Sequence, residues 1–316
     1  MRRASAPSRA TASAALALAL APACGARDAI VGAGLPRGAD GGVAGAVLFS
    51  SELASDDGAW DVFTPLPGAR VTFGVAHAGA GSRDGRVAAL VYPGDPALTA
   101  ADRTDSDLNT GISTKQYFQY GTFRGRVQLA TCAPEEDIAS AVFMYFTDGG
   151  DANANGIADL HELDLQVLCG APSVVVMTAW SDYELAASGA EVFRKLSHAV
   201  DTATGDVYDT PAPNERAFAK TGNDPTLVHP GFPAQGTFYE VGIERAADHV
   251  RFFAVLDGSE VTLWTLGDVT YVPQVPLPLM FNLWHPGTHW VPSTTPANYP
   301  AHDGVLLVDY AEWRAP

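Results

Sequence analysis

Residues 162–169 read ELDLQVLC, and polar and apolar residues alternate along this stretch. Side chains two positions apart on a β-strand share one face, so the alternation predicts a strand with two different faces. The apolar set is Leu163, Leu165 and Val167, and the polar set is Glu162, Asp164 and Gln166. Carboxylates are costly to bury without solvent or hydrogen bonds. The polar face is therefore expected to line an open cleft, unless this is an ordinary sandwich strand with a polar outer face.

Similar strand signals recur along the rest of the chain. The runs are rich in Val, Phe, Tyr and Trp and are separated by Gly, Pro, Asp and Asn, at 121–130, 141–147, 173–180, 237–245, 250–256, 261–266, 277–284 and 305–313. LDGS at 256–259 predicts a hairpin turn. Only 182–200 offers helical content, and it fits one helix or two short strands. Many strands with so few helices predict an all-β antiparallel sandwich or barrel.

Composition narrows the possible partners. The 316 residues are 47% hydrophobic, which is enough for a large buried core. Lys and Arg number 19 against 36 Asp and Glu, a net charge of -17. Such an acidic chain is a poor ligand for nucleic acid or anionic lipid, so we expect no nucleic-acid partner. We also expect a monomer.

The N-terminus has the features of an export signal. Arg2, Arg3 and Arg9 precede a short apolar run, and small residues precede Cys24. Residues 1–24 are therefore expected to be a signal peptide, with either lipidation of Cys24, as in a bacterial lipoprotein, or cleavage without lipid. Residues 25–45 are Gly/Ala-rich and predict a flexible tether. Residues 46–316 are expected to form one domain of a secreted or cell-envelope protein, which touches a membrane only through such a lipid.

Five blocks follow one another in a recognisable order. They are TGISTKQYFQYGTFRGRVQLA (110–130), HELDLQVLCG (161–170), TFYEVGIERAADHVRFFAVLDG (237–258), PLMFNLWHPGTHW (278–290) and VLLVDYAEW (305–313). Together they resemble glycoside hydrolase family 16, over about residues 46–316. The resemblance implies a concanavalin A-like β-jelly-roll sandwich of two curved antiparallel sheets, with a polysaccharide as partner.

The resemblance also assigns roles on the strand quoted above. The catalytic strand of the family follows E-x-D-x-E, with an optional extra residue before the last Glu. Glu162 matches the nucleophile and Asp164 the middle aspartate, whereas the acid/base position falls on Gln166, or on Val167 if the extra residue is counted. Neither can donate or accept a proton as a general acid or base at neutral pH. A substitute acid outside the strand would have to come from Glu135, Glu136, Asp137, Asp182 or Glu184.

Aromatic and histidine residues in these blocks suit a sugar site. Trp180, Trp284 and Trp290 lie in blocks that border the cleft in the family, and sugars stack on aromatic rings; core packing is the alternative for each. His161 is expected to contact substrate. His285 and His289 lie beside these blocks, and for each histidine a polar surface or loop contact is the favoured alternative.

The segment DANANGIADLHE (151–162) fits a calcium-loop pattern. Asp151, Asn153, Asn155 and Asp159 supply oxygen ligands at the required spacing. Strands rather than helices are expected on both sides, which disfavours an EF-hand. The alternatives are a calcium loop without helices, whose ligands end at Asp159, and a metal-free Asx/Gly-rich loop. Possible Ca²⁺ is the one cofactor that the sequence indicates.

Cys132 and Cys169 are the two cysteines outside the signal segment. Both lie at strand ends, and in an oxidising compartment they are candidates for a disulfide, with two reduced thiols as the alternative.

Two functions of different class remain. The first is an exported glycoside hydrolase or transglycosylase that acts on a β-linked polysaccharide by a retaining mechanism, impaired by Gln166. The second is a non-catalytic glycan-binding lipoprotein on the same scaffold. A calcium-stabilised adhesion module is a more distant third.

Overall fold

The computed structural model describes residues 45–77, 85–104, 108–147, 150, 160–185, 191–211, 217–233, 236–292 and 294–316, and for 183–185 and 191–193 it describes the backbone alone. In this part of the chain the only helices are two 3₁₀ turns, η1 (Pro225–Leu227) and η2 (Val269–Tyr271). No described helix has the length and hydropathy needed to span a bilayer.

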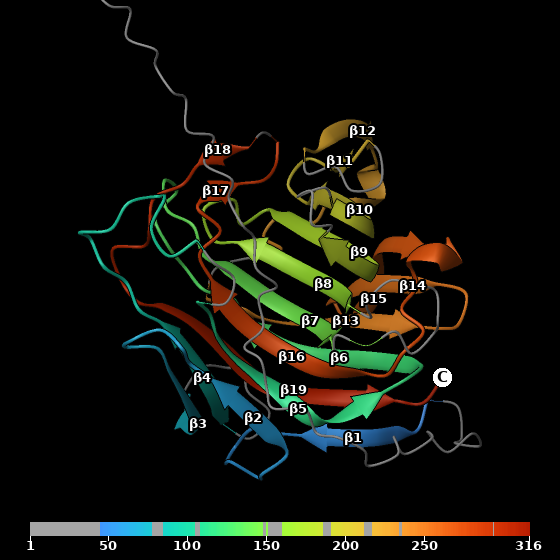
Figure 1. The fold of residues 1–316 in the computed structure, drawn as a ribbon, viewed down its shortest axis with the longest axis horizontal. Coiled ribbons are helices and arrows are strands. Elements are labelled where there is room, and N and C mark those ends of the chain that lie inside the picture. Colours follow the sequence, from blue (N-terminus) through green and yellow to red (C-terminus); the bar gives the residue numbers. More distant parts are fainter. Residues whose placement is uncertain are drawn as a thin grey trace, which may run out of the picture.

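The first large sheet contains the strand that includes Glu162, Asp164 and Gln166. Its order is β12 (Ala219–Asn223), β11 (Asp206–Asp209), β10 (Glu191–Asp201), β9 (Val174–Leu185), β8 (Leu160–Leu168), β7 (Ala139–Thr147), β16 (Leu277–Trp284), β5 (Thr110–Phe118) and β2 (Trp60–Phe63). All neighbouring pairs are antiparallel. Strand β8 lies in the middle of this sheet (Figure 1).

The second sheet packs behind the first. Its order is β15 (Ser259–Leu266), β14 (Val250–Leu256), β13 (Phe238–Arg245), β6 (Gly121–Gln128), β19 (Gly304–Arg314), β4 (Arg86–Tyr92) and β3 (Arg70–Ala76), and β1 (Val47–Ser51) also pairs with β19. A separate hairpin joins β17 (Thr288–His289) to β18 (Thr295–Pro296). The expected all-β, concanavalin A-like β-jelly-roll sandwich of two curved antiparallel sheets is confirmed (Figure 1).

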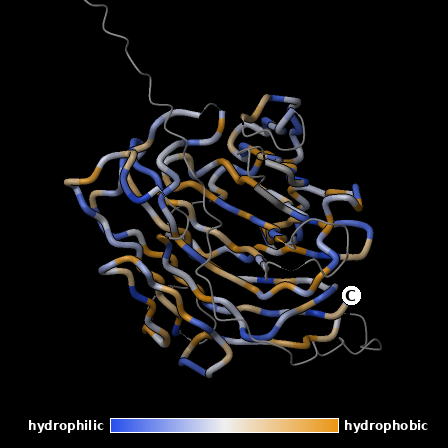
Figure 2. The backbone as a smooth tube through the Cα atoms, viewed as in Figure 1, coloured by the Kyte–Doolittle hydropathy of each residue, from blue (hydrophilic) through white to orange (hydrophobic). Residues whose placement is uncertain are grey.

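One apolar core fills the space between the sheets. It takes every second residue from the central strands of both sheets, so that Phe281 of β16 meets Phe123 of β6 with ring centroids 5.6 Å apart. Figure 2 shows the same alternation as changes of colour along the strands. Period-two patterning therefore decides which face of each strand is buried.

Two local expectations are settled by backbone geometry. In the segment 182–200, the described residues 182–185 and 191–200 form strands rather than a helix, because β9 continues to Leu185 and β10 begins at Glu191. The hairpin at 256–259 is present, and both central residues, Asp257 (φ 52°) and Gly258 (φ 79°), have the positive φ that a type I′ turn requires.

Candidate functional site

Strand β8 presents two chemically distinct faces. Leu163 is 0% exposed, and Leu165 and Val167 accompany it in the core between the sheets. Glu162, Asp164 and Gln166 project from the opposite face, where Glu162 and Gln166 are half-buried and Asp164 is buried. The side-chain parity expected from the sequence is therefore the parity of the folded strand.

Neighbouring strands surround this polar row with aromatic and small residues. Tyr145 and Trp180 flank Glu162, on β7 and β9 respectively. Phe143 and Thr178 flank Asp164, and Ala141 and Val176 flank Gln166. Residues directly opposite each other across a ladder have Cβ atoms about 5 Å apart, so these side chains are in mutual reach. The neighbours of the row are thus apolar or aromatic, with Thr178 as the polar exception among these six.

The two carboxyl groups are coupled by a proton. Burial raises the pKa of Glu162 well above its usual range, and the neighbouring Asp164 carboxyl raises it further, so that Glu162 holds a proton and hydrogen-bonds to Asp164. Burial also raises the pKa of Asp164, although hydrogen bonds from Glu162 and Gln166 oppose the shift. The positive charge of Lys195 lowers the pKa of both groups. Two like charges this close resist joint ionisation, so the second proton leaves the pair less readily than the first.

Acceptor atoms in this row lack donors. The Gln166 amide donates to Asp164, which fixes its NH₂ group toward the carboxyl. Its Oε1 atom and the Oδ1 atom of Asp164 are buried, and neither has a hydrogen-bond partner among the described residues. Buried acceptors without donors are unusual in folded proteins, and a bound molecule that carries hydroxyl groups would supply the missing donors.

Asn282 belongs to the same row, although the sequence analysis did not single it out. Asn282 pairs with Ala141, which in turn pairs with Gln166, so the two amides stand on either side of a small residue. Its side chain is buried, and its Oδ1 atom has no partner among the described residues. The signal was present, because Asn282 is the one polar residue in the strand LPLMFNLW.

Tryptophans stand at both ends of the polar row. Trp180 is half-exposed beside Glu162, and the Lys195 ammonium lies 4.6 Å from the centre of its ring. Trp284 ends β16, and its ring centroid is 5.8 Å from that of Trp290. Trp290 also packs on an apolar cluster that contains Val176, the neighbour of Gln166. All three expected tryptophans therefore border the face that carries Glu162.

The expectation for His161 is corrected. His161 precedes Glu162 by one residue, so its side chain lies on the opposite face of β8 and is 1% exposed. Its ring nitrogens face Ser181 Oγ at 3.4 Å and Asp182 Oδ1 at 3.6 Å. A substrate on the Glu162 face cannot reach an imidazole on the other side of the sheet.

Most of the acids proposed as substitutes for position 166 are engaged elsewhere. The Glu136 carboxylate accepts hydrogen bonds from the backbone N–H groups of Ala133 and Ala301, at 3.2 and 3.0 Å. Asp182 is buried beside His161, behind the strand. The side chain of Glu184 lies outside the described residues, and Glu135 makes no described contact with the polar row.

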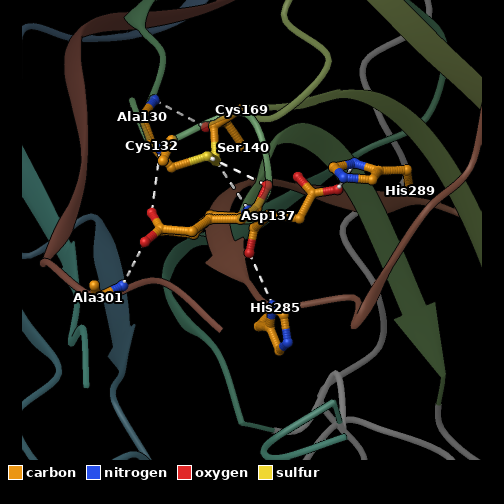
Figure 3. Close-up of a disulfide and its surroundings, with 11 residues drawn as sticks. Ala130, Cys132, Asp137, Ser140, Cys169, His285, His289 and Ala301 are labelled. Carbon is orange, nitrogen blue, oxygen red and sulfur yellow. Dashed lines mark hydrogen bonds and ion pairs between the residues drawn. A yellow bond between two sulfur atoms is a disulfide. The ribbon is translucent and has the colours of Figure 1, made fainter. Parts of the chain in front are cut away.

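Asp137 forms a separate polar centre near the end of β8. Its carboxyl group is fully buried and lies 2.9 Å from His289 Nδ1. Backbone N–H groups of Ile138 and Gly170 donate to it, and its own carbonyl accepts from His285 Nδ1 at 2.8 Å. Burial raises the pKa of Asp137 to about 8. Figure 3 shows this group beside the disulfide that joins Cys132 to Cys169.

Two expected sites lie outside the described residues. They are the lipidation site Cys24 and the calcium ligands Asp151, Asn153, Asn155 and Asp159. Within the ranges that the structure describes, no group of three or more His, Cys, Asp or Glu side chains is placed to hold a metal ion.

Comparison with known proteins gives matches among solved structures alone. The chain matches no known family profile and no curated protein. The catalytic domain of a laminarinase from Thermotoga maritima is 15% identical to this chain, with a TM-score of 0.48. The match covers 87% of this chain and 99% of the laminarinase chain. A Bacillus licheniformis β-glucanase is 13% identical over 85% and 98% of the two chains, with a TM-score of 0.45. The Crh5 transglycosylase bound to NAG is 17% identical over 86% and 85%, with a TM-score of 0.47. Likenesses this distant say nothing about which side chains act.

Proposed function

We propose that this protein is an exported enzyme of the glycoside hydrolase family 16 type, which cleaves or transfers a β-linked polysaccharide with Glu162 as nucleophile. The observation that carries the proposal is the polar row Glu162–Asp164–Gln166 on one face of β8, bordered by Trp180 at one end and by Trp284 and Trp290 at the other. Aromatic walls with a few convergent polar groups are the usual composition of a small-molecule or sugar site.

The proton shared by the two carboxyls fits this role for Glu162. A carboxylic acid cannot attack a sugar carbon, so Glu162 must first lose its proton. Asp164 is the hydrogen-bonded neighbour that can take it, since burial raises the pKa of both groups. The resulting Glu162 carboxylate would form a bond to the anomeric carbon as the bond to the leaving oxygen breaks, in the manner of a retaining glycosidase.

Gln166 limits the first step of this reaction. The leaving oxygen needs a proton, and an amide can donate a hydrogen bond to it but no proton. General acid help is typically worth about 10²–10⁴ in rate, so we propose an enzyme that is slow on unactivated polysaccharides. The proton would have to come from water or from the Glu162/Asp164 pair itself.

Sugar release tests the proposal. Laminarin, lichenan, agarose, carrageenan and xyloglucan would each be incubated with the wild-type protein and with Glu162→Gln, which is nearly isosteric and cannot attack. We expect the wild type to release reducing ends from at least one polysaccharide and the variant to release none. Equal release by both proteins would remove Glu162 from the mechanism.

The second candidate is a glycan-binding lipoprotein without turnover. Gln166 is the observation that favours it, because an amide at this position preserves binding and removes the acid. In this case a thermal-shift screen of the same polysaccharides would raise the melting temperature of both proteins equally, with no release of sugar by either.

We also propose that the loop 151–162 binds calcium and that Cys24 carries a lipid. Calcium at a hundred times its dissociation constant would add about 2.7 kcal/mol to the free energy of unfolding. Chelation should therefore lower the melting temperature of the wild type but leave that of Asp151→Ala unchanged. Mass spectrometry of the membrane fraction would show whether Cys24 carries acyl chains.

A further inference from the structure

An Asp–His pair lies beyond the polar row, at the point where β8 ends. Figure 3 shows the Asp137 carboxyl facing the His289 ring. Asp137 is fully buried and its carboxyl lies 2.9 Å from His289 Nδ1, whereas the His289 side chain is 17% exposed. The two ring nitrogens of an imidazole point in different directions, so a histidine held through Nδ1 presents Nε2 away from its partner. The buried carboxyl thus fixes the orientation of a partly exposed ring.

The turn after β8 is shaped to receive this ring. A Cβ atom on Gly170 would lie 2.6 Å from His289 Cε1 and 2.3 Å from the carbonyl oxygen of Glu136, so only glycine allows the imidazole to lie against the turn. The same turn is joined to the loop between β6 and β7 by the Cys132–Cys169 disulfide and by the backbone hydrogen bond from Cys169 N to Ile138 O, 3.0 Å long. His289 therefore rests on a braced platform rather than on a free loop.

His289 is also adjacent to the aromatic pair that borders the polar row. Trp290 follows it directly and contacts Trp284, which lies on the Glu162 face of the sheet. Gly170, against which His289 rests, is four residues beyond Gln166 and lies in the turn that follows the end of β8 at Leu168. The imidazole therefore lies beyond the end of the polar row, and its sequence neighbour Trp290 packs on the apolar cluster that contains Val176, a residue of the Glu162 face.

Electrostatics favour an uncharged imidazole here. Burial lowers the pKa of His289 and raises that of Asp137 to about 8, so the contact favours a neutral imidazole beside a protonated carboxyl. Nε2 of a neutral imidazole donates or accepts one hydrogen bond without a charge. A hydroxyl group, which can also donate or accept, is therefore a better partner for it than a charged group.

We propose that His289 Nε2, with Trp284 and Trp290, forms a distal carbohydrate subsite that binds a sugar hydroxyl away from the Glu162 centre, and that Asp137 is the positioning residue. This inference rests on the proposed function, because it extends the same glycan-binding face.

Two substitutions of His289 separate binding from scaffolding. His289→Asn keeps a side-chain nitrogen near the Nδ1 position and can still contact Asp137, but it has nothing at the Nε2 position. His289→Gln reaches toward the Nε2 position and loses the contact with Asp137. His249→Asn is the matched control, since His249 pairs with Asp248 at 2.8 Å but lies in the turn between β13 and β14 of the other sheet.

Affinity gel electrophoresis measures the dissociation constant for each of laminarin, lichenan, agarose, carrageenan and xyloglucan. Thermal unfolding measures the melting temperature, which reports whether the fold is intact. We expect His289→Asn to bind the retarding polysaccharide roughly three- to tenfold more weakly, the loss of one hydrogen bond, at an unchanged melting temperature. His289→Gln should retain more of the affinity and melt lower, and His249→Asn should bind like the wild type.

The outcomes distinguish the two levels of the proposal. If the wild type is retarded and His289→Asn is retarded equally, the subsite does not exist, and the proposed function stands. The subsite is also overturned if the affinity loss in His289→Asn comes with a matching fall in melting temperature. If none of the five polysaccharides retards the wild type, the proposed function fails and the subsite fails with it.

Discussion

Glu162 stands directly opposite Trp180 across strands β8 and β9, so a carboxyl group and the edge of an aromatic platform share one small area of the sheet. Lys195, the next residue along the same row, holds its ammonium over the Trp180 ring. Glu162, Trp180 and Lys195 thus lie side by side on the neighbouring strands β8, β9 and β10. Each of them can be substituted separately.

Trp180 should matter for affinity more than for stability. Its ring is half-exposed, so Trp180→Ala removes a surface for a sugar ring without opening a cavity in the core. We expect about tenfold weaker binding of the retarding polysaccharide, equivalent to about 1.4 kcal/mol, and partial recovery in Trp180→Phe. Isothermal titration calorimetry provides the measurement. An unchanged affinity in Trp180→Ala would show that the Trp180 ring does not contact the bound glycan.

Lys195 should set the ionisation of Glu162. The pKa of Glu162 is raised by burial and by Asp164, and the Lys195 charge lowers it. Removing that charge in Lys195→Met should raise the pKa of Glu162 further, because the ionised form loses a favourable neighbour. Carbon-13 NMR titration of the glutamate carboxyls would detect the change, with Glu162→Gln used to assign the signal. A downward shift, or none, would contradict the proximity of these groups.

Asp137 should give the protein a stability that depends on pH. The carboxyl titrates at about 8 when folded and near 3.8 in the unfolded chain. Between these values the unfolded chain has lost the proton that the folded protein still holds. The stabilising contribution is therefore complete below about pH 4 and is lost as the pH rises to about 8, with a slope of at most about 1.4 kcal/mol per pH unit.

Asp137→Asn removes this titration. Denaturant unfolding of both proteins between pH 4 and pH 9 should show that the wild-type free energy of unfolding declines more steeply than that of the variant. Parallel curves would mean that the Asp137 carboxyl ionises normally in the fold.

The Cys132–Cys169 disulfide should contribute to stability through the unfolded chain. The two cysteines are 37 residues apart, and a cross-link of this kind typically adds about 2–4 kcal/mol by restricting the unfolded ensemble. We expect Cys132→Ser/Cys169→Ser to be destabilised by this amount in urea unfolding. Dithiothreitol should shift the wild type toward the variant and leave the variant itself unaffected.

The sequence was most informative where alternation is strong. The β8 pattern predicted both faces of the strand, and the runs from 121 onward became strands because period-two patterning fixes burial. Strands β1 to β4 were not anticipated, since VLFSS, WDVF and VAALVY are short or uniformly apolar. Strand β12 is AKTGN, and all five of its residues are exposed, so no pattern identifies it.

The site was less predictable for two separate reasons. His161 was misplaced although parity already excluded it, because adjacent residues of a strand point to opposite faces. The Asp137–His289 pair could not be foreseen, since the chain brings together residues from distant segments, and only the packing of the β8 turn against β17 shows it. Asn282 was visible as a polar residue in an apolar strand, but its row could be found only from the register of β7 and β16.

Gln166→Glu is the decisive substitution for a glycosidase centre on β8, because it restores an acid at one position of the polar row and leaves the length and volume of the side chain nearly unchanged. Initial rates of reducing-end release would be compared between this variant and the wild type on the polysaccharide that binds both. We predict a gain of roughly 10²–10⁴-fold in the variant, abolished when Glu162→Gln is added. A variant that binds the polysaccharide as tightly as the wild type and shows no gain in rate would contradict a glycosidase centre on this face of β8.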